Sequence, residues 1–310
     1  MSKAGDPRLV EIMRKTAVSS CNSLRLRLLG FPFDEGTVRN GGRAGASHGP
    51  AAIRERLQNF GSAINPEHDI NMLTANVVLE DGGDACGDTL EDAHASMRSL
   101  VSTALAEGAL PICIGGSNDQ SCSNASGWMQ ADSAAKEGLV INIDAHLDVR
   151  PVGNAGIHSG APFRLMFEQP EPGFVGRLVE FAAQGAQCSQ AHAEFVQEQG
   201  GEILWLSKLK AEGRSPADSF QLLLGQDTPT FLSFDIDSIR GSDAPGVSCP
   251  SVIGLSADDA LDIMFRAGQS PDIGLVDISE FNPLVEAGRT SRLVAHMIYY
   301  FLLGAASRPV

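Results

Sequence analysis

The sequence predicts an α/β protein in three layers, with a central, mainly parallel sheet that helices cover on both faces. Short apolar segments occur at intervals along all 310 residues, and longer amphipathic segments separate them. The apolar segments are hydrophobic at consecutive positions, which is typical of strands buried on both faces of a sheet. Regular alternation of such strands with helices favours a parallel sheet with helices on both sides.

Six segments have the composition of buried strands, with β-branched or other apolar residues at most positions. They begin at Leu24, Leu110, Gly138, Ile203, Thr230 and Ile273.

Amphipathic segments between these strands match helices. Residues 90–108 carry apolar side chains at helical spacing and stop at a glycine, and residues 256–268 open with a serine N-cap and an acidic first turn. Residues 289–304 form an apolar helix close to the C-terminus. Since no repeat, low-complexity tract or linker interrupts this order, we expect one domain over residues 1–310.

The composition limits the partners and the location of the protein. The net charge of −15 argues against nucleic acid or an anionic membrane surface as a partner. No apolar run approaches the roughly 20 residues of a membrane span, and the first residues have no apolar signal core. The six cysteines form no C-x-x-C pair, which favours reduced thiols and a cytoplasmic location. We expect a small-molecule substrate, with self-association into a homo-oligomer left open.

Two strand segments end in ionisable residues at alternate positions. Asp144, His146 and Asp148 follow the strand that begins at Gly138, and Asp235 and Asp237 end the strand that begins at Thr230. Side chains two positions apart on an extended chain point the same way. Open α/β sheets bind ligands at the carboxyl ends of their strands, where these groups converge.

Such a cluster of carboxylates requires a positive partner. Glu280 ends a further strand and adds to the negative charge, which one divalent cation would balance and two would balance better. Carboxylates with a single imidazole favour Mn²⁺ or a similar ion over a thiolate zinc site. Two such ions, bridged by shared carboxylates, can hold a hydroxide nucleophile. A lone D-x-D is usually a loop or helix-cap feature, but D-A-H-x-D and D-x-D on separate strands together favour a metal site.

At these motifs the sequence resembles the ureohydrolase superfamily, which comprises arginases, agmatinases and formiminoglutamases. "DAHLD" and "SFDID" are similar to the paired metal motifs of that superfamily, and the resemblance covers most of the chain. Further matching segments are "DEGTVRNGGRAGASHGPAAIR" from Asp34, the glycine turn at Gly115, "HSGAPFR" from His158, "DAPGVSCPS" from Asp243 and "ISEFNP" from Ile278. The resemblance implies a three-layer α/β/α arginase-like fold and two Mn²⁺ ions per subunit that hydrolyse a C–N bond.

Residue roles follow from the resemblance by position. Asp144 and Asp235 would bridge both metals, Asp148 would complete the shell of one ion, and His146 and Asp237 would complete that of the other.

Glu280 matches the acidic residue that pairs with a cationic guanidino or amidino group, and a carboxylate suits the planar N–H donors of that group. Asp237 or His158 is expected to move the proton during catalysis. The alternative for Glu280 is a structural ion pair with a surface lysine.

The chain departs from the family pattern at Asn118. The first motif of the family usually reads G-G-x-H, with the histidine as a terminal metal ligand, whereas this chain reads "GGSND". An asparagine oxygen can bind a hard cation but is a neutral and weaker donor than imidazole, so we expect Asn118 to be a ligand of the looser metal site. Alternatively Asn118 caps the following helix, and Asp119 is the ligand or that ion is absent.

A second departure lies in "HSGAPFR". Arginases and agmatinases have a proton-shuttling histidine at the position of Ser159, and His158 here stands one place earlier. The S-G-x-P-F-R form resembles formiminoglutamases. Whether His158 serves as the shuttle or faces away is open at this point.

Formiminoglutamate carries two carboxylates besides its formimino group, so its pocket should contain cations. Arginine suits bidentate binding of carboxylates. The residues expected to bind substrate are Arg39, Arg43, Ser159, Arg164 and Glu280.

The function expected from the resemblance is manganese-dependent hydrolysis of N-formimino-L-glutamate to L-glutamate and formamide, a step of histidine degradation. The alternatives are a ureohydrolase of arginase, agmatinase or guanidinobutyrase type, or a catalytically silent arginase-like protein with impaired metal binding. A deacetylase-like hydrolase is weaker, because its single-zinc D-x-H pattern leaves the second D-x-D and Glu280 unexplained.

Overall fold

The computed structural model describes residues 7–13, 23–75, 77–168, 173–211 and 213–308. Ten strands are described: β1 (Leu24–Phe31), β2 (Ile64–Asn65), β3 (Ile70–Asn71), β4 (Val77–Asp84), β5 (Ala109–Gly115), β6 (Leu139–Ile143), β7 (Arg177–Ala183), β8 (Glu202–Trp205), β9 (Thr230–Asp235) and β10 (Ile273–Ser279). The α-helices are α1 (Val10–Met13), α2 (Glu35–Arg39), α3 (Gly49–Gln58), α4 (Leu90–Ala106), α5 (Gln120–Ala131), α6 (Pro162–Glu168), α7 (Gln190–Glu198), α8 (Leu206–Ala211), α9 (Pro216–Gln221), α10 (Ala257–Gln269) and α11 (Gly288–Ala306).

Eight strands form one sheet in the order β4-β1-β5-β10-β9-β6-β7-β8, and every neighbouring pair is parallel. The strand β10 lies between β5 and β9, so it joins the two halves of the sheet. Because all eight strands run the same way, their carboxyl ends share one edge. The order places the ends of β5, β10, β9 and β6 side by side at the middle of that edge.

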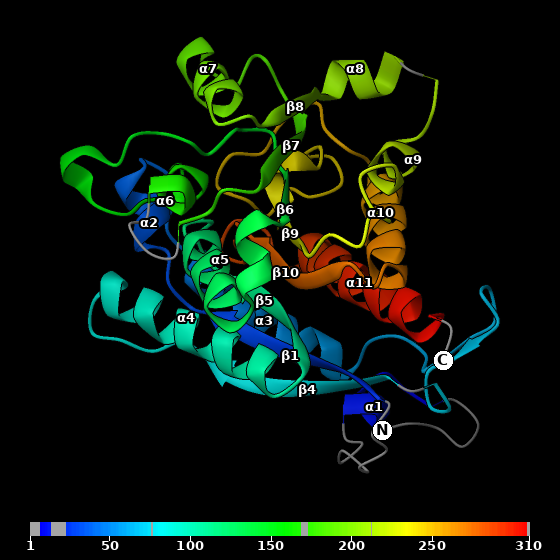
Figure 1. Cartoon of the computed structure of the whole chain (residues 1–310). Helices are drawn as coiled ribbons and strands as arrows, with labels where there is room; N and C mark the ends of the chain where they lie inside the picture. The colour runs from blue at the N-terminus through cyan, green and yellow to red at the C-terminus, as the bar shows by residue number, and fades with distance from the viewer. Residues whose placement is uncertain (1–6, 14–22, 76, 169–172, 212, 309–310) are drawn as a thin grey trace.

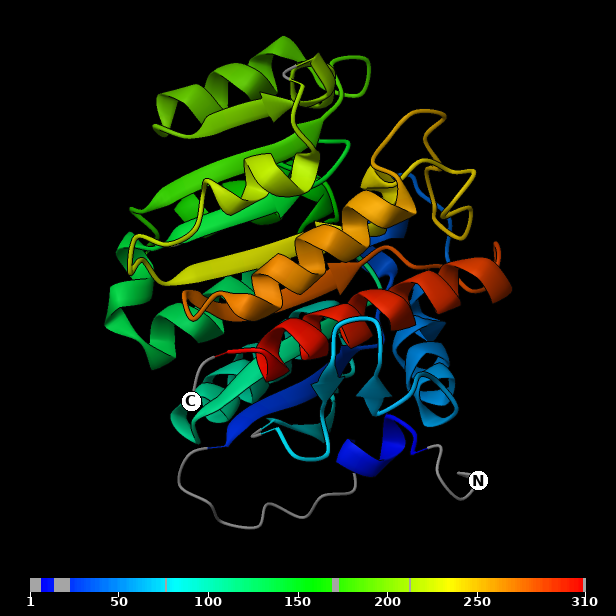
Figure 2. The same cartoon turned by 90° about the vertical axis from the view of Figure 1, so that its right-hand side faces the viewer.

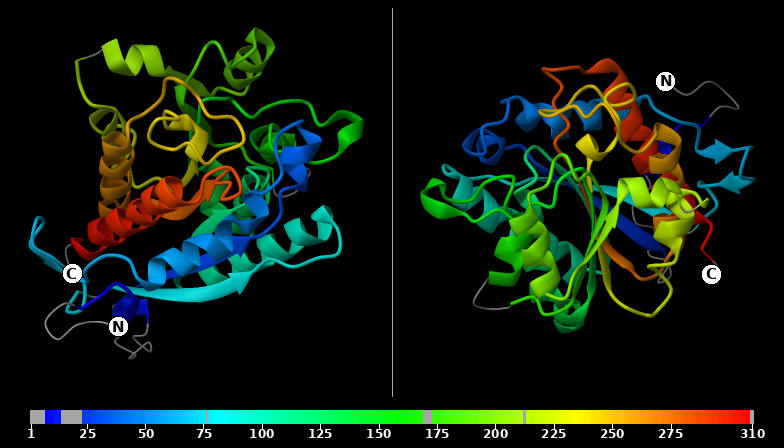
Figure 3. Two further views of the ribbon diagram at one scale, coloured as in Figure 1. Left: turned by 180° about the vertical axis from the view of Figure 1, so that it is seen from behind. Right: turned by 90° about the horizontal axis from the view of Figure 1, so that it is seen from above.

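Helices cover the sheet on both faces, which confirms the predicted three layers. The helices α3, α9, α10 and α11 lie on one face, and α4, α5 and α6 lie on the other (Figures 1 and 2). Figure 3 shows α10 and α11 running across the sheet on the face opposite α4. Each face has its own apolar cluster, so the two faces of the sheet bury separate cores.

The six predicted strands and the three predicted helices are all present. The helix α10 begins with the predicted Ser256 cap, which forms a capping box with Asp259. The strands β4 and β7 were not predicted, nor was the short hairpin of β2 and β3.

The cysteines that the structure describes, Cys86, Cys113, Cys122, Cys188 and Cys249, are free thiols, as predicted. Cys21 and the two ends of the expected 1–310 domain lie outside the described residues. Among the described helices none has the length and apolarity needed to cross a membrane.

Candidate metal centre

The central strands bring the two acidic motifs together. The strands β6 and β9 pair directly, with Ile143 opposite Phe234 at the carboxyl end. Asp144 follows β6 and Asp235 ends β9, so both carboxylates leave neighbouring strands at the same level. Asp144, Asp235 and Asp237 are 5% exposed or less. The sequence-predicted convergence of these carboxylates is therefore present in the structure.

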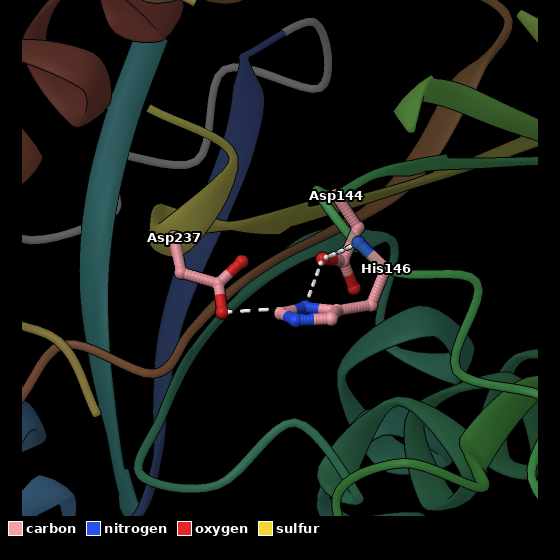
Figure 4. Close-up of side chains that lie close together, drawn as sticks. All are labelled: Asp144, His146 and Asp237. Carbon is pink, nitrogen blue, oxygen red and sulfur yellow. Dashed lines mark hydrogen bonds and ion pairs between the residues drawn. The ribbon is translucent and has the colours of Figure 1, made fainter. Parts of the chain in front are cut away.

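The ligand atoms of these residues form two groups that share Asp144. Asp144, His146 and Asp237 form one group, and Asp144, Asp148 and Asp235 form the other, with the ligand atoms of each group within 4.8 Å of one another. The first group offers two carboxylates and an imidazole, and the second offers carboxylates alone. Figure 4 shows the His146 ring between the carboxylates of Asp144 and Asp237, with its Nδ1 3.2 Å from Asp144 Oδ1 and 3.4 Å from Asp237 Oδ2.

Burial and the closeness of several carboxylates shift the pKa values of the residues in these two groups. Burial and the neighbouring Asp144 carboxylate raise the pKa of Asp148 well above its usual value, and burial and Asp237 do the same for Asp235. Burial opposes the charged His146 ring, yet the Asp237 and Asp144 carboxylates raise its pKa strongly. Burial alone would raise the pKa of Asp144, but the hydrogen bond and the charge of the His146 ring lower it.

These residues fit divalent cations. The Asp144 Oδ2 and Asp237 Oδ1 atoms are buried and have no hydrogen-bond partner. Buried carboxylate oxygens without partners are costly, and a cation removes that cost. The donor set, five oxygen-bearing or imidazole side chains without a thiolate, matches the preference of Mn²⁺.

Asn118 lies beside the ligand groups. Its side-chain Nδ2 donates to Asp148 Oδ2 at 2.7 Å, and its Oδ1 accepts from the hydroxyls of Ser121 at 3.0 Å and Ser279 at 2.9 Å. The amide is therefore next to a ligand carboxylate, and its role as a ligand of the looser metal site stays a prediction.

Two of the alternatives for this position are a helix cap by Asn118 and ligation by Asp119. The helix α5 begins after Asn118, and neither Asn118 nor the N-cap residue Asp119 caps it through a side chain. Asp119 does not face the ligand groups, because its Oδ2 lies 2.8 Å from His94 Nε2.

A cavity of about 370 Å³ opens above the two ligand groups, and His146, Asp148, Asp235 and Asp237 line its floor. Its remaining lining residues are Thr37, Asn40, Gly41, Gly42, Arg43, Arg150, Ser159, Ser248, Cys249 and Glu280.

Glu280 lines this cavity and is held by two hydrogen bonds. Its Oε1 accepts from Thr37 Oγ1 at 2.8 Å and from the backbone N–H of Asn118 at 2.9 Å. Its backbone φ of 64° is rare for a residue with a side chain, which marks a constrained position at the end of β10. Burial raises the pKa of Glu280 to about 8, and the Asp237 carboxylate adds to this. No surface lysine pairs with it, so the structural alternative is not supported among the described residues.

Besides Glu280, two further predicted substrate-binding residues, Ser159 and Arg43, line the cavity. The backbone N–H of Ser159 bonds to Gly36, and its Oγ accepts from Asn40 Nδ2 at 3.0 Å. The Arg43 guanidinium donates to the carbonyls of Val247 and Ser248, so it also holds the loop after β9.

Sequence reasoning missed Arg150, which lines the same cavity and donates to Asn40 Oδ1 at 3.3 Å. Spacing gave no signal for Arg150, because the chain does not stay extended after Asp144 and Asp148 has a φ of 43°.

Three other predicted residues lie outside the cavity lining. The His158 ring is turned to the backbone, with Nε2 3.3 Å from the Pro151 carbonyl and Nδ1 accepting from Gly160 N–H at 3.2 Å. Both ring nitrogens are occupied, so the structure corrects the prediction of His158 as a proton shuttle.

The other two are arginines engaged elsewhere. Arg39 forms ion pairs with Glu35 and Glu91. Arg164 pairs with Glu168 and stacks on the Phe195 ring at 3.8 Å. Both side chains have structural partners, and the structure corrects their assignment to substrate.

The fold and the paired ligand groups define a binuclear metallohydrolase of the arginase type. A family model described as "Arginase family" matches residues 24–304, and the chain belongs to that family.

Among similar proteins, a formimidoylglutamase of Geobacillus thermodenitrificans is 32% identical over 86% of this chain and 80% of its own length. A formimidoylglutamase of Halobacterium salinarum is 30% identical over 90% of this chain and 87% of its own. A crystal structure of Trypanosoma cruzi formiminoglutamase with Mn²⁺ is 45% identical, covers 98% of this chain and all of its own, and superposes with a TM-score of 0.88.

Proposed function

We propose that the protein is a manganese-dependent formiminoglutamase, which hydrolyses N-formimino-L-glutamate to L-glutamate and formamide. The observation that carries this proposal is one cavity lined by four residues of the two cation-ligand groups, by an acid suited to an amidine, and by arginines suited to carboxylates. The formiminoglutamase names of relatives that align over most of the chain support the same substrate.

The ligand groups would hold two Mn²⁺ ions, one at Asp144, His146 and Asp237 and one at Asp144, Asp148 and Asp235. When bound, such ions activate water and polarise the bond to be cleaved. The chain itself supplies Asp237 as the proton carrier between water and the leaving nitrogen. Asp237 lines the cavity beside the ligand groups, where its carboxylate can accept a proton from water and return it to the leaving nitrogen.

Glu280 would bind the formimino group. The carboxylate accepts two hydrogen bonds from the protein, from Thr37 and from the Asn118 backbone, which fix its direction in the cavity. A cationic amidine would stabilise the ionised carboxylate and lower its raised pKa.

The substrate carboxylates would bind to Arg150 and Arg43, with Asn40 and Ser159 as polar neighbours. Neither arginine forms an ion pair with an acidic side chain among the described residues. This distinguishes them from Arg39 and Arg164, and favours a substrate with two carboxylates over arginine, which has one carboxylate, or agmatine, which has none.

The decisive experiment incubates the Mn²⁺-loaded protein with formiminoglutamate, arginine, agmatine and guanidinobutyrate and measures formamide or urea release. We expect turnover of formiminoglutamate. Turnover of arginine alone would reject the proposal, and absence of both turnover and manganese uptake would favour the catalytically silent alternative.

Manganese binding is expected to release protons and to strengthen as pH rises. In the metal-free protein the pKa values of Asp148, Asp235 and His146 are raised, so a cation must displace more protons near neutral pH than it would from unperturbed groups. Affinity should increase about tenfold per pH unit for each proton displaced. Calorimetry between pH 6 and 8, in buffers of different ionisation enthalpy, measures the number released, and a pH-independent affinity would contradict this expectation.

Replacing Arg150 by Met is expected to raise KM for formiminoglutamate about 10- to 100-fold with a smaller change in kcat, since a charged hydrogen bond to a carboxylate contributes about 1.5–3 kcal/mol. Steady-state kinetics provide the measurement. Formamidine, which lacks carboxylates, should be affected little. Arg39→Met is the matched control because Arg39 lies outside the cavity. An equal loss in both variants would remove Arg150 from the substrate site.

A further inference from the structure

The Asn40 side chain lies between two other side chains of the cavity wall. Asn40 is the C-cap residue of α2, whereas Arg150 and Ser159 lie in the segment between β6 and α6. The Asn40 Oδ1 accepts from Arg150 Nη1 at 3.3 Å, and the Asn40 Nδ2 donates to Ser159 Oγ at 3.0 Å. One amide therefore bonds to both an arginine and a serine that face the cavity.

The backbone holds these residues in a fixed arrangement. The Arg150 N–H donates to the Gly160 carbonyl at 2.7 Å, and the Ser159 N–H donates to the Gly36 carbonyl of α2 at 3.1 Å. A Cβ at Gly160 would lie 2.9 Å from Asn40 Nδ2 and 2.8 Å from Arg150 Cδ, so only glycine fits between them. Figure 1 shows α2 beside α6, the helix that follows Ser159. The Asn40 contacts are thus part of the packing of α2 against this segment.

Arg150 determines the direction of both hydrogen bonds. A guanidinium donates and never accepts, so the Asn40 atom that faces Arg150 is the amide oxygen. The Asn40 NH₂ group then faces Ser159, and the Ser159 oxygen accepts from it. The hydrogen of the Ser159 hydroxyl has no acceptor among the described residues. Since Ser159 and Arg150 both line the cavity, this hydrogen and the remaining N–H groups of Arg150 are available to one ligand.

We propose that Asn40 is a positioning residue that turns the Ser159 hydroxyl hydrogen into the cavity beside the Arg150 guanidinium, and so completes one subsite for a carboxylate of the substrate. Adjacent donors suit the two oxygens of a carboxylate, which accepts hydrogen bonds and donates none. An ammonium group, which only donates, is disfavoured at the same place. This inference rests on the proposed function, because it concerns a carboxylate of formiminoglutamate, but it involves none of the metal ligands.

Asn40→Asp is the sharpest test, because the two side chains have the same shape but an ionised carboxylate only accepts. The Ser159 hydroxyl must then donate to the new carboxylate, and Arg150 gains an anionic neighbour that competes with the substrate. We expect KM for formiminoglutamate to rise at least about tenfold while kcat changes less than about threefold. Calorimetry with L-glutamate, which carries the same two carboxylates, should show a similar rise in Kd.

Asn40→Ala removes both hydrogen bonds without adding a charge. It should raise KM and the Kd for L-glutamate about 3- to 10-fold, the usual effect of losing neutral hydrogen bonds. The matched control is Asn59→Ala, since Asn59 is the C-cap residue of α3, is exposed and lies outside the cavity lining. Wild-type KM and Kd are expected for it. Hydrolysis of formamidine, which has no carboxylate, should be nearly unchanged in every variant.

A double-mutant cycle with Ser159→Ala tests the direction of the hydrogen bond. Alone, Ser159→Ala should raise KM about 3- to 10-fold, and in the Asn40→Asp background less than about twofold, because the hydroxyl hydrogen is already taken there. A wild-type KM in Asn40→Asp, an equal loss with formamidine, or an undiminished effect of Ser159→Ala in that background would each overturn the proposal.

L-Glutamate binding separates this proposal from the proposed reaction. A protein that binds L-glutamate with the expected variant effects but does not hydrolyse formiminoglutamate would retain the carboxylate subsite and reject the reaction alone. A wild-type protein that binds neither compound would overturn both.

Discussion

Replacing Asp144 by Asn is expected to remove both manganese ions and to lower formiminoglutamate hydrolysis by at least about 10²- to 10³-fold, the effect of deleting a main electrostatic contributor to catalysis. Asp144 is the one residue that belongs to both ligand groups, and its Oδ2 is buried without a protein partner. An amide presents a neutral oxygen in its place and cannot balance two cations. Metal content after gel filtration and initial rates at saturating Mn²⁺ measure the effect.

The control for this substitution is Glu180→Gln. Glu180 is an equally buried acid on the neighbouring strand β7, and its partner is Asn142 rather than a ligand residue. Burial raises its pKa well above the usual value, so a neutral glutamine changes little there. If Asp144→Asn retained two tightly bound ions, the assignment of the shared ligand would be wrong.

Glu280→Gln is expected to lower kcat/KM about 10²- to 10³-fold, because the amidine loses its charged partner while the site keeps its shape. Glutamine can still accept the hydrogen bonds of Thr37 and the Asn118 backbone. Manganese content should stay at two ions per chain, since Glu280 lies outside both ligand groups. Steady-state kinetics with parallel metal analysis therefore distinguish this variant from Asp144→Asn.

A suitable comparison is Glu35→Gln, which alters an exposed acid on α2, beside Thr37 but paired with Arg39. Wild-type kinetics are expected for it. Should Glu280→Gln lose manganese instead of substrate affinity, Glu280 would belong to the metal centre.

The strands that are apolar along their whole length could be predicted from the sequence. The strand β4 escaped prediction because it is an edge strand, whose second half, Glu80 to Asp84, is polar and partly exposed. The strand β7 escaped because Glu180 interrupts its apolar run. That acid is tolerated inside the sheet through the hydrogen bond from Asn142 on β6, a contact that no local pattern reveals.

The convergence of the candidate ligands was predictable because β6 and β9 are neighbours and end at the same edge of the sheet. The expected extended alternation is absent: the chain bends after Asp144, Asp148 has a φ of 43°, and Asp237 lies in a 3-10 helix, Ile236–Ser238. The orientation of an amide or a ring depends instead on partners that are distant in sequence. Asn118 faces Asp148 because hydroxyls from α5 and β10 meet its oxygen, and His158 turns away because Pro151 and Gly160 accept or donate at its ring nitrogens.

The sheet order has a consequence for how the nascent chain matures. Until the ribosome releases β10, the part of the sheet from β4 to β5 and the part from β9 to β8 have no strand between them, and β5 and β9 each present an unpaired edge. Insertion of one late strand then unites the halves and delivers Glu280 and the Ser279 hydroxyl in the same event. We therefore expect a chain that ends before β10 to lack Glu280 and to leave the facing edges of β5 and β9 unpaired.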